Sequence, residues 1–265
     1  MLTTLQLNWR SPDGRFEKQI IKRGVAGTNK PTERAKCAYL INDTKNKSEL
    51  IIGFENSDFE RNISILLQTM CTGEVSQCKA PHNDNFKLKL VEFQSAGMIY
   101  EWPAGVKHNL AQELKTAGNA NVKKDEFNEA GYKYRKALKY LLSIPMDVEH
   151  PPSVVDGVTI AELTELKVAL YNNLALCAFK SREYDRVLRL CEKCLDLDTR
   201  NVKATYKIGE SHYFLGNYEL AMSSFKEVLN REPHNRAAFD YVQMVQGKIK
   251  EEKIKYNEIV KKMFR

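Results

Sequence analysis

The second half of the chain repeats one pattern of apolar, small and polar positions every 34 residues. Residues 168–201 and 202–235 align without a gap. The matched pairs are Leu174/Ile208, Ala175/Gly209, Tyr184/Tyr218, Val187/Ala221, Cys191/Phe225 and Cys194/Val228. The spacing predicts two amphipathic helices in each unit, in which a small residue on the first helix lets the second helix approach closely.

A 34-residue unit of two helices resembles the tetratricopeptide repeat. A first unit follows the same template over residues 111–142. An insertion at 143–167 contains three prolines and predicts a loop joined to a lengthened helix. Three repeats within 104–235 are enough to bury a continuous stacked core, with residues 236–265 as a C-terminal capping helix. An ordinary helical bundle is the alternative interpretation.

Residues 1–103 show a different pattern, of short alternating or apolar runs typical of strands. The predicted strands are 16–22, 35–41, 48–54, 75–79 and 86–93. One helix is predicted over 58–70, with Asp58 as its N-cap and Thr72-Gly73 ending it. The predicted fold class is therefore α+β, a small antiparallel sheet with one helix, followed by an all-α superhelix of repeats. The boundary is expected near Trp102-Pro103.

The composition of the 265 residues limits the classes of function. No apolar run is long enough to predict a membrane span, and the first residues do not read as a secretory signal. The six cysteines then suggest reduced thiols and a cytosolic or nuclear location. A nucleotide-binding glycine loop, a Ser-His-Asp order and a metal-ligand set are not evident in the sequence, and therefore no cofactor and no metal are expected.

The net charge of +7 is concentrated at the C-terminal end. Residues 248–265 carry seven basic and three acidic side chains. A solvated helix face is the preferred interpretation, although such a helix can also touch calmodulin, a membrane surface or nucleic acid. No aromatic-interleaved basic patch accompanies the charges, so neither a nucleic-acid nor a membrane partner is expected.

Cys191-Glu-Lys-Cys194 has the spacing of a redox or metal motif. The two cysteines match Phe225 and Val228 of the next repeat, however, and small buried thiols behave as apolar side chains. We therefore expect them to be buried, reduced and without metal.

Over nearly its whole length the chain resembles the tacrolimus-binding immunophilins (the FKBP family) that carry tetratricopeptide repeats, above all their divergent members. The segments that carry the likeness outside the repeats are 9–16, 18–24, Lys30-Pro31, Ile52-Gly53, the helix 58–70, Gly73-Glu74, 86–93, 100–102 and 261–264. The resemblance implies a prolyl-isomerase fold for the first unit and a peptide groove for the repeats.

The isomerase pocket of this family needs an aromatic lining, and the sequence departs from it at three places. The stretch between Tyr39 and Ile51 is too short for the Phe-Asp strand. The helix opens without the Gly-Trp floor, and the segment from Glu74 to Phe86 is too short for the loop that carries a tyrosine. We therefore expect a degenerate domain that is not an enzyme.

The resemblance also implies a carboxylate clamp, a set of polar residues that binds the two carboxylates at the end of a peptide. Five positions match it. They are Lys115, Asn119, Asn173, Lys203 and Lys207, which we call the clamp residues. The family usually has Arg where Lys207 stands, and Lys cannot bind a carboxylate bidentately, so this corner is expected to be weaker. Asn172 is expected to be merely exposed.

The implied partner is the Glu-Glu-Val-Asp tail of heat shock protein 90 or of its seventy-kilodalton counterpart, together with an unidentified client protein. The function predicted on this basis is a non-catalytic co-chaperone adaptor. Two alternatives stay open: an active prolyl isomerase with a rearranged pocket, and a repeat scaffold for an unrelated partner.

Overall fold

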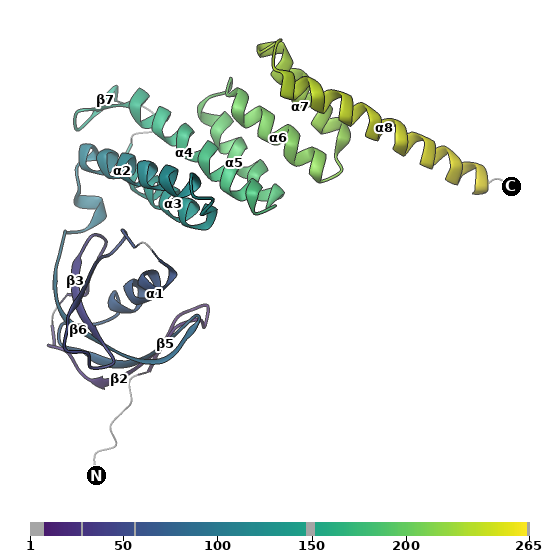
Figure 1. The fold of residues 1–265 in the computed structure, drawn as a ribbon. Helices are drawn as coiled ribbons and strands as arrows, with labels where there is room; N and C mark the ends of the chain where they lie inside the picture. Colours follow the sequence, from purple (N-terminus) through teal and green to yellow (C-terminus); the bar gives the residue numbers. More distant parts are fainter. Residues whose placement is uncertain (1–7, 28, 56, 147–151, 264–265) are drawn as a thin grey trace. The chain divides into compact units, whose positions relative to one another are not determined.

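The computed structural model describes residues 8–263 apart from 28, 56 and 147–151. The chain consists of two compact units, divided between Trp102 and Pro103. The first unit is a sheet with one helix, and the second is built mainly of helices (Figure 1). This is the fold class that the sequence predicts. Among the described residues, no helix is both long and apolar enough to cross a membrane.

The first unit is a single antiparallel sheet of six strands, in the order β1-β2-β5-β6-β3-β4. The strands are β1 (Asn8–Arg10), β2 (Glu17–Lys22), β3 (Lys36–Ile41), β4 (Ser48–Ile51), β5 (Val75–Ala80) and β6 (Asn83–Gln94). The five predicted runs all contain strands, while the short edge strand β1 was not predicted. Its three residues are too few for an alternation to be visible, and only pairing with β2 defines it.

One helix, α1 (Asp58–Leu67), covers one face of this sheet (Figure 1). Its buried side chains Ile63, Leu66 and Leu67 form one core with buried strand residues such as Leu88 and Leu90. The helix differs from the prediction at both ends. Ser57, not Asp58, is the N-cap, because the Ser57 side chain accepts a hydrogen bond from the Glu60 backbone amide. The helix stops at Leu67, three residues before the predicted end.

The second unit contains seven helices among the described residues, most of them joined by short turns. They are α2 (Ala104–Val122), α3 (Phe127–Leu142), α4 (Ile160–Lys180), α5 (Tyr184–Leu197), α6 (Val202–Phe214), α7 (Tyr218–Arg231) and α8 (Arg236–Met263). Consecutive helices pack on each other as pairs. A short 3₁₀ helix, η1 (Ile99–Glu101), precedes Trp102 in the first unit.

Close packing within two of the pairs depends on a glycine on the first helix. A Cβ at Gly118 would lie 2.5 Å from the Tyr134 ring, and one at Gly209 would lie 2.9 Å from the Phe225 ring. Real Cβ atoms do not approach neighbours so closely, so only glycine lets these aromatic rings pack against the opposite helix. The matched small residue of the middle repeat is Ala175, which is fully buried in one core with Cys191, a smaller residue than Tyr134 or Phe225.

The insertion between α3 and α4 is partly ordered. Strands β7 (Val154–Val155) and β8 (Val158–Thr159) form a small hairpin that was not predicted. Asp156, at the hairpin turn, accepts a hydrogen bond from the Ala104 backbone amide at 2.9 Å, which fixes the hairpin to the start of α2. Thr159 then begins α4 with a capping box to Glu162. Of the predicted loop prolines, Pro145 and Pro152 belong to the described residues and lie in no helix or strand, while Pro151 lies outside the described residues.

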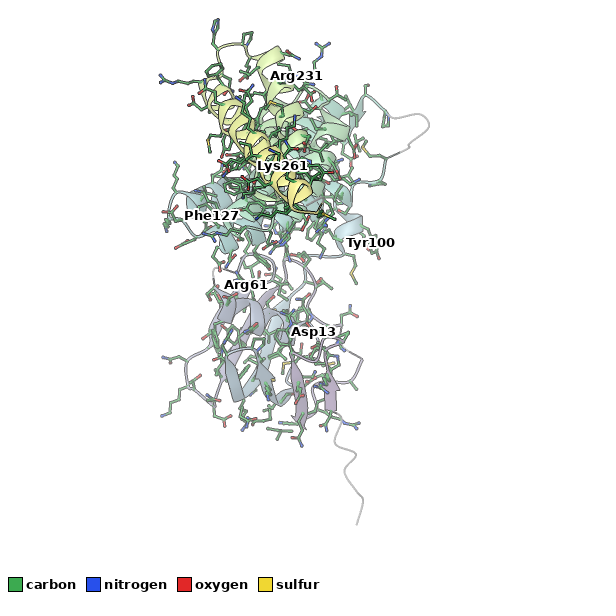
Figure 2. All side chains as sticks on the ribbon, turned by 90° about the vertical axis from the view of Figure 1, so that its right-hand side faces the viewer. Asp13, Arg61, Tyr100, Phe127, Arg231 and Lys261 are labelled. Carbon is green, nitrogen blue, oxygen red and sulfur yellow. The ribbon has the colours of Figure 1, made fainter. Side chains whose placement is uncertain are left out.

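Helix α8 is packed at its start and exposed at its end. Ala238 and Val245 are buried in the core of the last repeat, whereas every residue from 250 to 259 is exposed. Figure 1 shows α8 running on past α7, and Figure 2 labels Lys261, an exposed residue of this distal part. The helix therefore caps the last repeat with its first half and extends beyond it with the second.

Candidate functional site: a groove in the repeat unit

A groove of ≈ 590 Å³ is lined by α4, α6, the end of α7 and the start of α8. Its lining residues are Asn172, Asn173, Leu176, Val202, Lys203, Tyr206, Lys207, Glu232, Asn235 and Ala237. Three of the five clamp residues thus line one groove. Apolar side chains lie between the polar ones, and burial raises the pKa of Tyr206 to about 12, so this phenol stays protonated at neutral pH.

Asn119 lies beside this groove and is oriented by two hydrogen bonds. Its Oδ1 accepts from the Tyr134 hydroxyl at 2.7 Å and from Asn173 Nδ2 at 3.1 Å. Because both bonds use the amide oxygen, the two N–H groups of Asn119 remain to donate to a ligand. The first repeat therefore presents an amide donor at this position, and the donor is linked directly to Asn173 of the second repeat.

Lys203 is exposed in the first turn of α6. That turn is fixed by Asn201, the N-cap, whose Oδ1 accepts from the Ala204 backbone amide at 3.0 Å. The same oxygen accepts from Asn172 Nδ2 on α4 at 3.2 Å. The expectation that Asn172 is merely exposed is therefore wrong, because it is half-buried and ties the start of α6 to α4. Among the described residues, none forms an ion pair with Lys203.

Lys207 is held in place by two neighbours. Its Nζ lies 2.5 Å from Glu210 Oε2, one turn further along α6, and 4.2 Å from the centre of the Phe179 ring on α4. An ammonium group over an aromatic face is attracted by the ring quadrupole. The predicted cation at this corner of the groove thus has a largely buried carboxylate beside it.

Lys115 does not line this groove. It lines a separate cavity of ≈ 200 Å³ between α2 and α4, together with His108, Gln112, Glu162, Glu165, Leu166 and Ala169. Asn119 follows Lys115 by one turn of α2 and is bonded to Asn173 at the groove. The clamp residues therefore form a row along the repeats rather than one closed pocket. Two glutamates share the cavity with Lys115, which lowers the positive potential at this end of the row.

Two functional candidates were not identified from the sequence, Tyr134 and Glu210. Tyr134 occupies the core position that matches Cys191 and Phe225, and this place in the repeat indicates packing alone. A buried phenol needs a hydrogen-bond partner, so a tyrosine at this position predicts that some polar group lies nearby. The sequence does not show which group it is. Glu210 lies three positions after Lys207, a spacing that places both on one helix face and was available in the sequence.

The cysteine pair lies in the core of the second repeat. Cys191 and Cys194 are fully buried free thiols, and burial raises the pKa of Cys191 to about 12 and that of Cys194 to about 11. Over the described part of the chain, no group of three or more His, Cys, Asp or Glu side chains is arranged to hold a metal ion. The thiols are thus protonated at neutral pH and pack as apolar groups.

In the first unit, the connections between strands at which the family's isomerase pocket is expected are short. Strands β5 and β6 form a hairpin in which Ala80 pairs with Asn83, so only two residues make the turn. Strands β3 and β4 are likewise neighbours in the sheet. Their pairing runs from Tyr39 opposite Ser48 to Lys36 opposite Ile51. Ile52, just after β4, and Ile63, in the middle of α1, are both fully buried in the core that the sheet and the helix share.

Comparison with known proteins gives the following likenesses. The tetratricopeptide repeat model matches residues 202–235. The chain is 27% identical to the human FK506-binding protein-like over 91% of this chain and 68% of that protein. It is 30% identical to FK506-binding protein 59 of Drosophila melanogaster over 76% of this chain, but spans only 47% of that protein. FK506 is another name for tacrolimus.

Among solved structures, the C-terminal TPR-containing domain of a Plasmodium falciparum FK506-binding protein aligns with a TM-score of 0.52 and 28% identity. The alignment covers 58% of this chain and 98% of that domain.

Proposed function

Because the chain belongs to the tacrolimus-binding immunophilins that carry tetratricopeptide repeats, we propose that it is a non-catalytic co-chaperone adaptor. Its groove binds the C-terminal Glu-Glu-Val-Asp tail of heat shock protein 90, or of the seventy-kilodalton heat shock protein. Its first unit or the distal part of α8 binds a client protein. The observation that carries this proposal is the groove that brings Asn173, Lys203 and Lys207 together.

The chemistry of the groove suits such a tail. The last residue of the peptide carries two carboxylates, one on the side chain and one on the main chain. Lysine ammonium groups donate charge-assisted hydrogen bonds to them, and asparagine amides donate without adding charge. The amide oxygen of Asn119 already accepts hydrogen bonds from Tyr134 and Asn173, so its N–H groups are the part left to bind a carboxylate. Leu176, Val202 and Tyr206 offer apolar contacts for a valine side chain.

The test is binding of a fluorescent pentapeptide that ends in Glu-Glu-Val-Asp to the full chain. We expect roughly micromolar affinity, about −8 kcal/mol. Lys203→Glu should abolish measurable binding, because it replaces attraction by repulsion at an exposed groove position. Lys226→Glu is the matched control, since it makes the same charge change on an exposed lysine of α7 outside the groove lining.

A second control examines the main-chain carboxylate. Amidation of the peptide's C-terminus should weaken binding about as much as loss of one lysine contact, on the order of 1.5–3 kcal/mol. Binding should also weaken as salt rises, because exposed charges are screened beyond about 10 Å at 0.1 M salt. Equal binding of the free and amidated peptides would reject the clamp and favour a repeat scaffold for an unrelated partner.

The absence of isomerase activity is part of the same proposal. The two-residue turn between β5 and β6 and the burial of Ile52 and Ile63 in the core under α1 support it. The opposing observation is that several relatives are named peptidyl-prolyl cis-trans isomerases, including one of Mus musculus that is 25% identical over 69% of this chain. A protease-coupled proline-peptide assay of the full chain should show no acceleration. A measurable rate would favour the enzyme.

The proposed location of the adaptor is the cytosol, with the nucleus as a second compartment. The six free thiols suit a reducing environment.

A further inference from the structure

The ammonium group of Lys207 already has a carboxylate partner in the protein. Glu210 Oε2 lies 2.5 Å from Lys207 Nζ, and the side chain of Glu210 is only 10% exposed. Lys207 itself is 23% exposed, and the Phe179 ring covers another side of its ammonium group. A charge pair with this little contact with water is screened less than a surface pair. It is therefore a persistent contact that a ligand has to share or replace.

Glu210 is fixed from its other side by the capping helix. The hydroxyl of Tyr241, on α8, donates to Glu210 Oε1 at 3.3 Å. The Tyr241 ring is stacked on Phe225 with 4.7 Å between ring centres, so the hydroxyl has little freedom to move away. The carboxylate thus bridges Lys207 on α6 and Tyr241 on α8, and both of its oxygens are used.

The two lysines of α6 therefore differ in how available their charges are to a ligand. Lys203 is exposed and, among the described residues, has no ion-pair partner, so its charge is available to a ligand. The charge of Lys207 is balanced from within the protein. A ligand carboxylate that approaches Lys207 also approaches Glu210, and two carboxylates near each other repel.

We propose that Glu210 is an internal competitor for the ligand carboxylate at Lys207, and that it lowers the affinity of the groove for an acidic peptide. This inference rests on the proposed function, because it assumes an acidic peptide as ligand. In the free protein Glu210 neutralises the corner next to α8. Binding of the peptide requires Lys207 to share its N–H donors between Glu210 and the peptide, or to turn away from Glu210.

The test compares two substitutions that each remove one carboxylate. Glu210→Gln keeps an amide oxygen that can accept from Lys207 and Tyr241 but removes the repulsion. Glu232→Gln removes the same charge from the lining of the same groove, where Glu232 is bonded to Asn235 and not to Lys207. We expect Glu210→Gln to bind the Glu-Glu-Val-Asp pentapeptide roughly tenfold more tightly, and Glu232→Gln to bind it at most about threefold more tightly.

A second comparison links the effect to Lys207. In a Lys207→Met background, Glu210→Gln should change peptide affinity no more than Glu232→Gln does in the same background. Equal gains from Glu210→Gln and Glu232→Gln in the otherwise unchanged protein would overturn the proposal, because the effect would then be one of general groove charge. Thermal unfolding of each variant identifies any loss of affinity that comes from a damaged fold.

A measurement without peptide separates this inference from the proposed function. The rate of acetylation of each lysine by a small acylating reagent is followed by mass spectrometry. Lys207 should react more slowly than Lys203, and Glu210→Gln should raise the rate at Lys207 while leaving Lys203 unchanged. Rates at Lys207 that do not respond to Glu210→Gln would overturn the inference even when the peptide binds. If the peptide binds none of the proteins, the proposed function fails, and so does the proposed competition between Glu210 and the peptide. The acetylation rates then still show whether Lys207 and Glu210 form an ion pair in the free protein.

Discussion

The hydroxyl of Tyr134 determines which way the Asn119 amide points. The ring of Tyr134 is buried in the first repeat, and its oxygen donates to Asn119 Oδ1 at 2.7 Å. The matched positions of the other repeats, Cys191 and Phe225, cannot do this, since neither has a hydroxyl group. The residue is therefore both part of the core and a positioning residue for the groove.

Tyr134→Phe separates these two roles, because it removes the hydroxyl and keeps the ring. Asn119 is then held by Asn173 alone and can turn its amide, so peptide affinity should fall by roughly fivefold, about 1 kcal/mol. The thermal unfolding midpoint should change little. Tyr184→Phe is the control, as this half-buried tyrosine stacks on Phe214 away from the groove lining. Equal affinities for Tyr134→Phe and the unchanged protein would show that Asn119 needs no positioning.

Lys18 and Glu74 form a buried ion pair in the first unit. Their side chains are 3% and 5% exposed, and Nζ lies 2.8 Å from Oε1. Lys18 also donates to the Thr69 carbonyl at 2.9 Å, and Glu74 accepts from Ser76 Oγ and from the Cys71 backbone amide. The pair thus ties the segment that follows α1 to strand β2, with most of the polar groups satisfied.

Lys18→Met should destabilise the first unit strongly, by about 3–5 kcal/mol, because it leaves a buried carboxylate without its cation. The control is Lys36→Met, which removes one member of the exposed pair with Glu49 and should cost no more than about 1 kcal/mol. Tryptophan fluorescence during urea unfolding measures both, since Trp9 and Trp102 are the two tryptophans of the chain and belong to this unit. Similar midpoints for the two variants would contradict the prediction.

At the scale of elements, the packing of the two helices in the first and in the last repeat depends on a contact between a glycine and an aromatic ring. In α6 and α7 this contact joins Gly209 and Phe225, and Phe225 in turn stacks on Tyr241 of α8. The distance between the two helices is therefore set by the missing Cβ. The position of α8, which lines the groove, depends on the same contact.

Gly209→Ala should destabilise the repeat unit although alanine is the better helix former. The gain of roughly 1 kcal/mol in helix propensity is outweighed by a Cβ placed 2.9 Å from the Phe225 ring, since overpacking costs about 1–3 kcal/mol. Gly247→Ala in α8 is the matched control, because a Cβ there meets nothing within 4 Å. It should be neutral or stabilising. Circular dichroism at 222 nm during thermal unfolding distinguishes the two, and a rise in midpoint for Gly209→Ala would refute the packing argument.

At the scale of the whole molecule, buried thiols occur in both units. Burial raises the pKa values of Cys37 and Cys78 in the first unit, and of Cys191 in the second, to about 12, from an ordinary value of 9.0. The folded thiols keep their protons above pH 9, where the thiols of the unfolded chain lose them. The unfolded state therefore binds fewer protons, and the free energy of unfolding must fall as pH rises.

We expect full stability of both units below about pH 9 and a progressive loss between about pH 9 and 12. Urea midpoints at a series of pH values measure it, by tryptophan fluorescence for the first unit and by circular dichroism for the repeats. Cys78→Val removes one of these thiols and should make the decline of the first unit shallower. Midpoints that stay level up to pH 11 would argue against buried thiols as the cause.

The features that the sequence alone determined are those with a local physical cause. The 34-residue period located the helix pairs, because an amphipathic helix must place its apolar residues at fixed intervals. Spacings of four placed Lys115 beside Asn119 and Lys203 beside Lys207. The strands with visible alternation were located as well, whereas β1 was missed because three residues carry no period.

The tertiary structure alone decided which of these polar residues meet. The bond between Asn173 and Asn119 joins positions 54 residues apart, and that between Tyr241 and Glu210 joins positions 31 apart. No periodicity encodes such contacts, because they depend on the distance and rotation between packed helices, which the side chains at the contact set. The same packing separated Lys115 from the groove and placed Glu210 against Lys207.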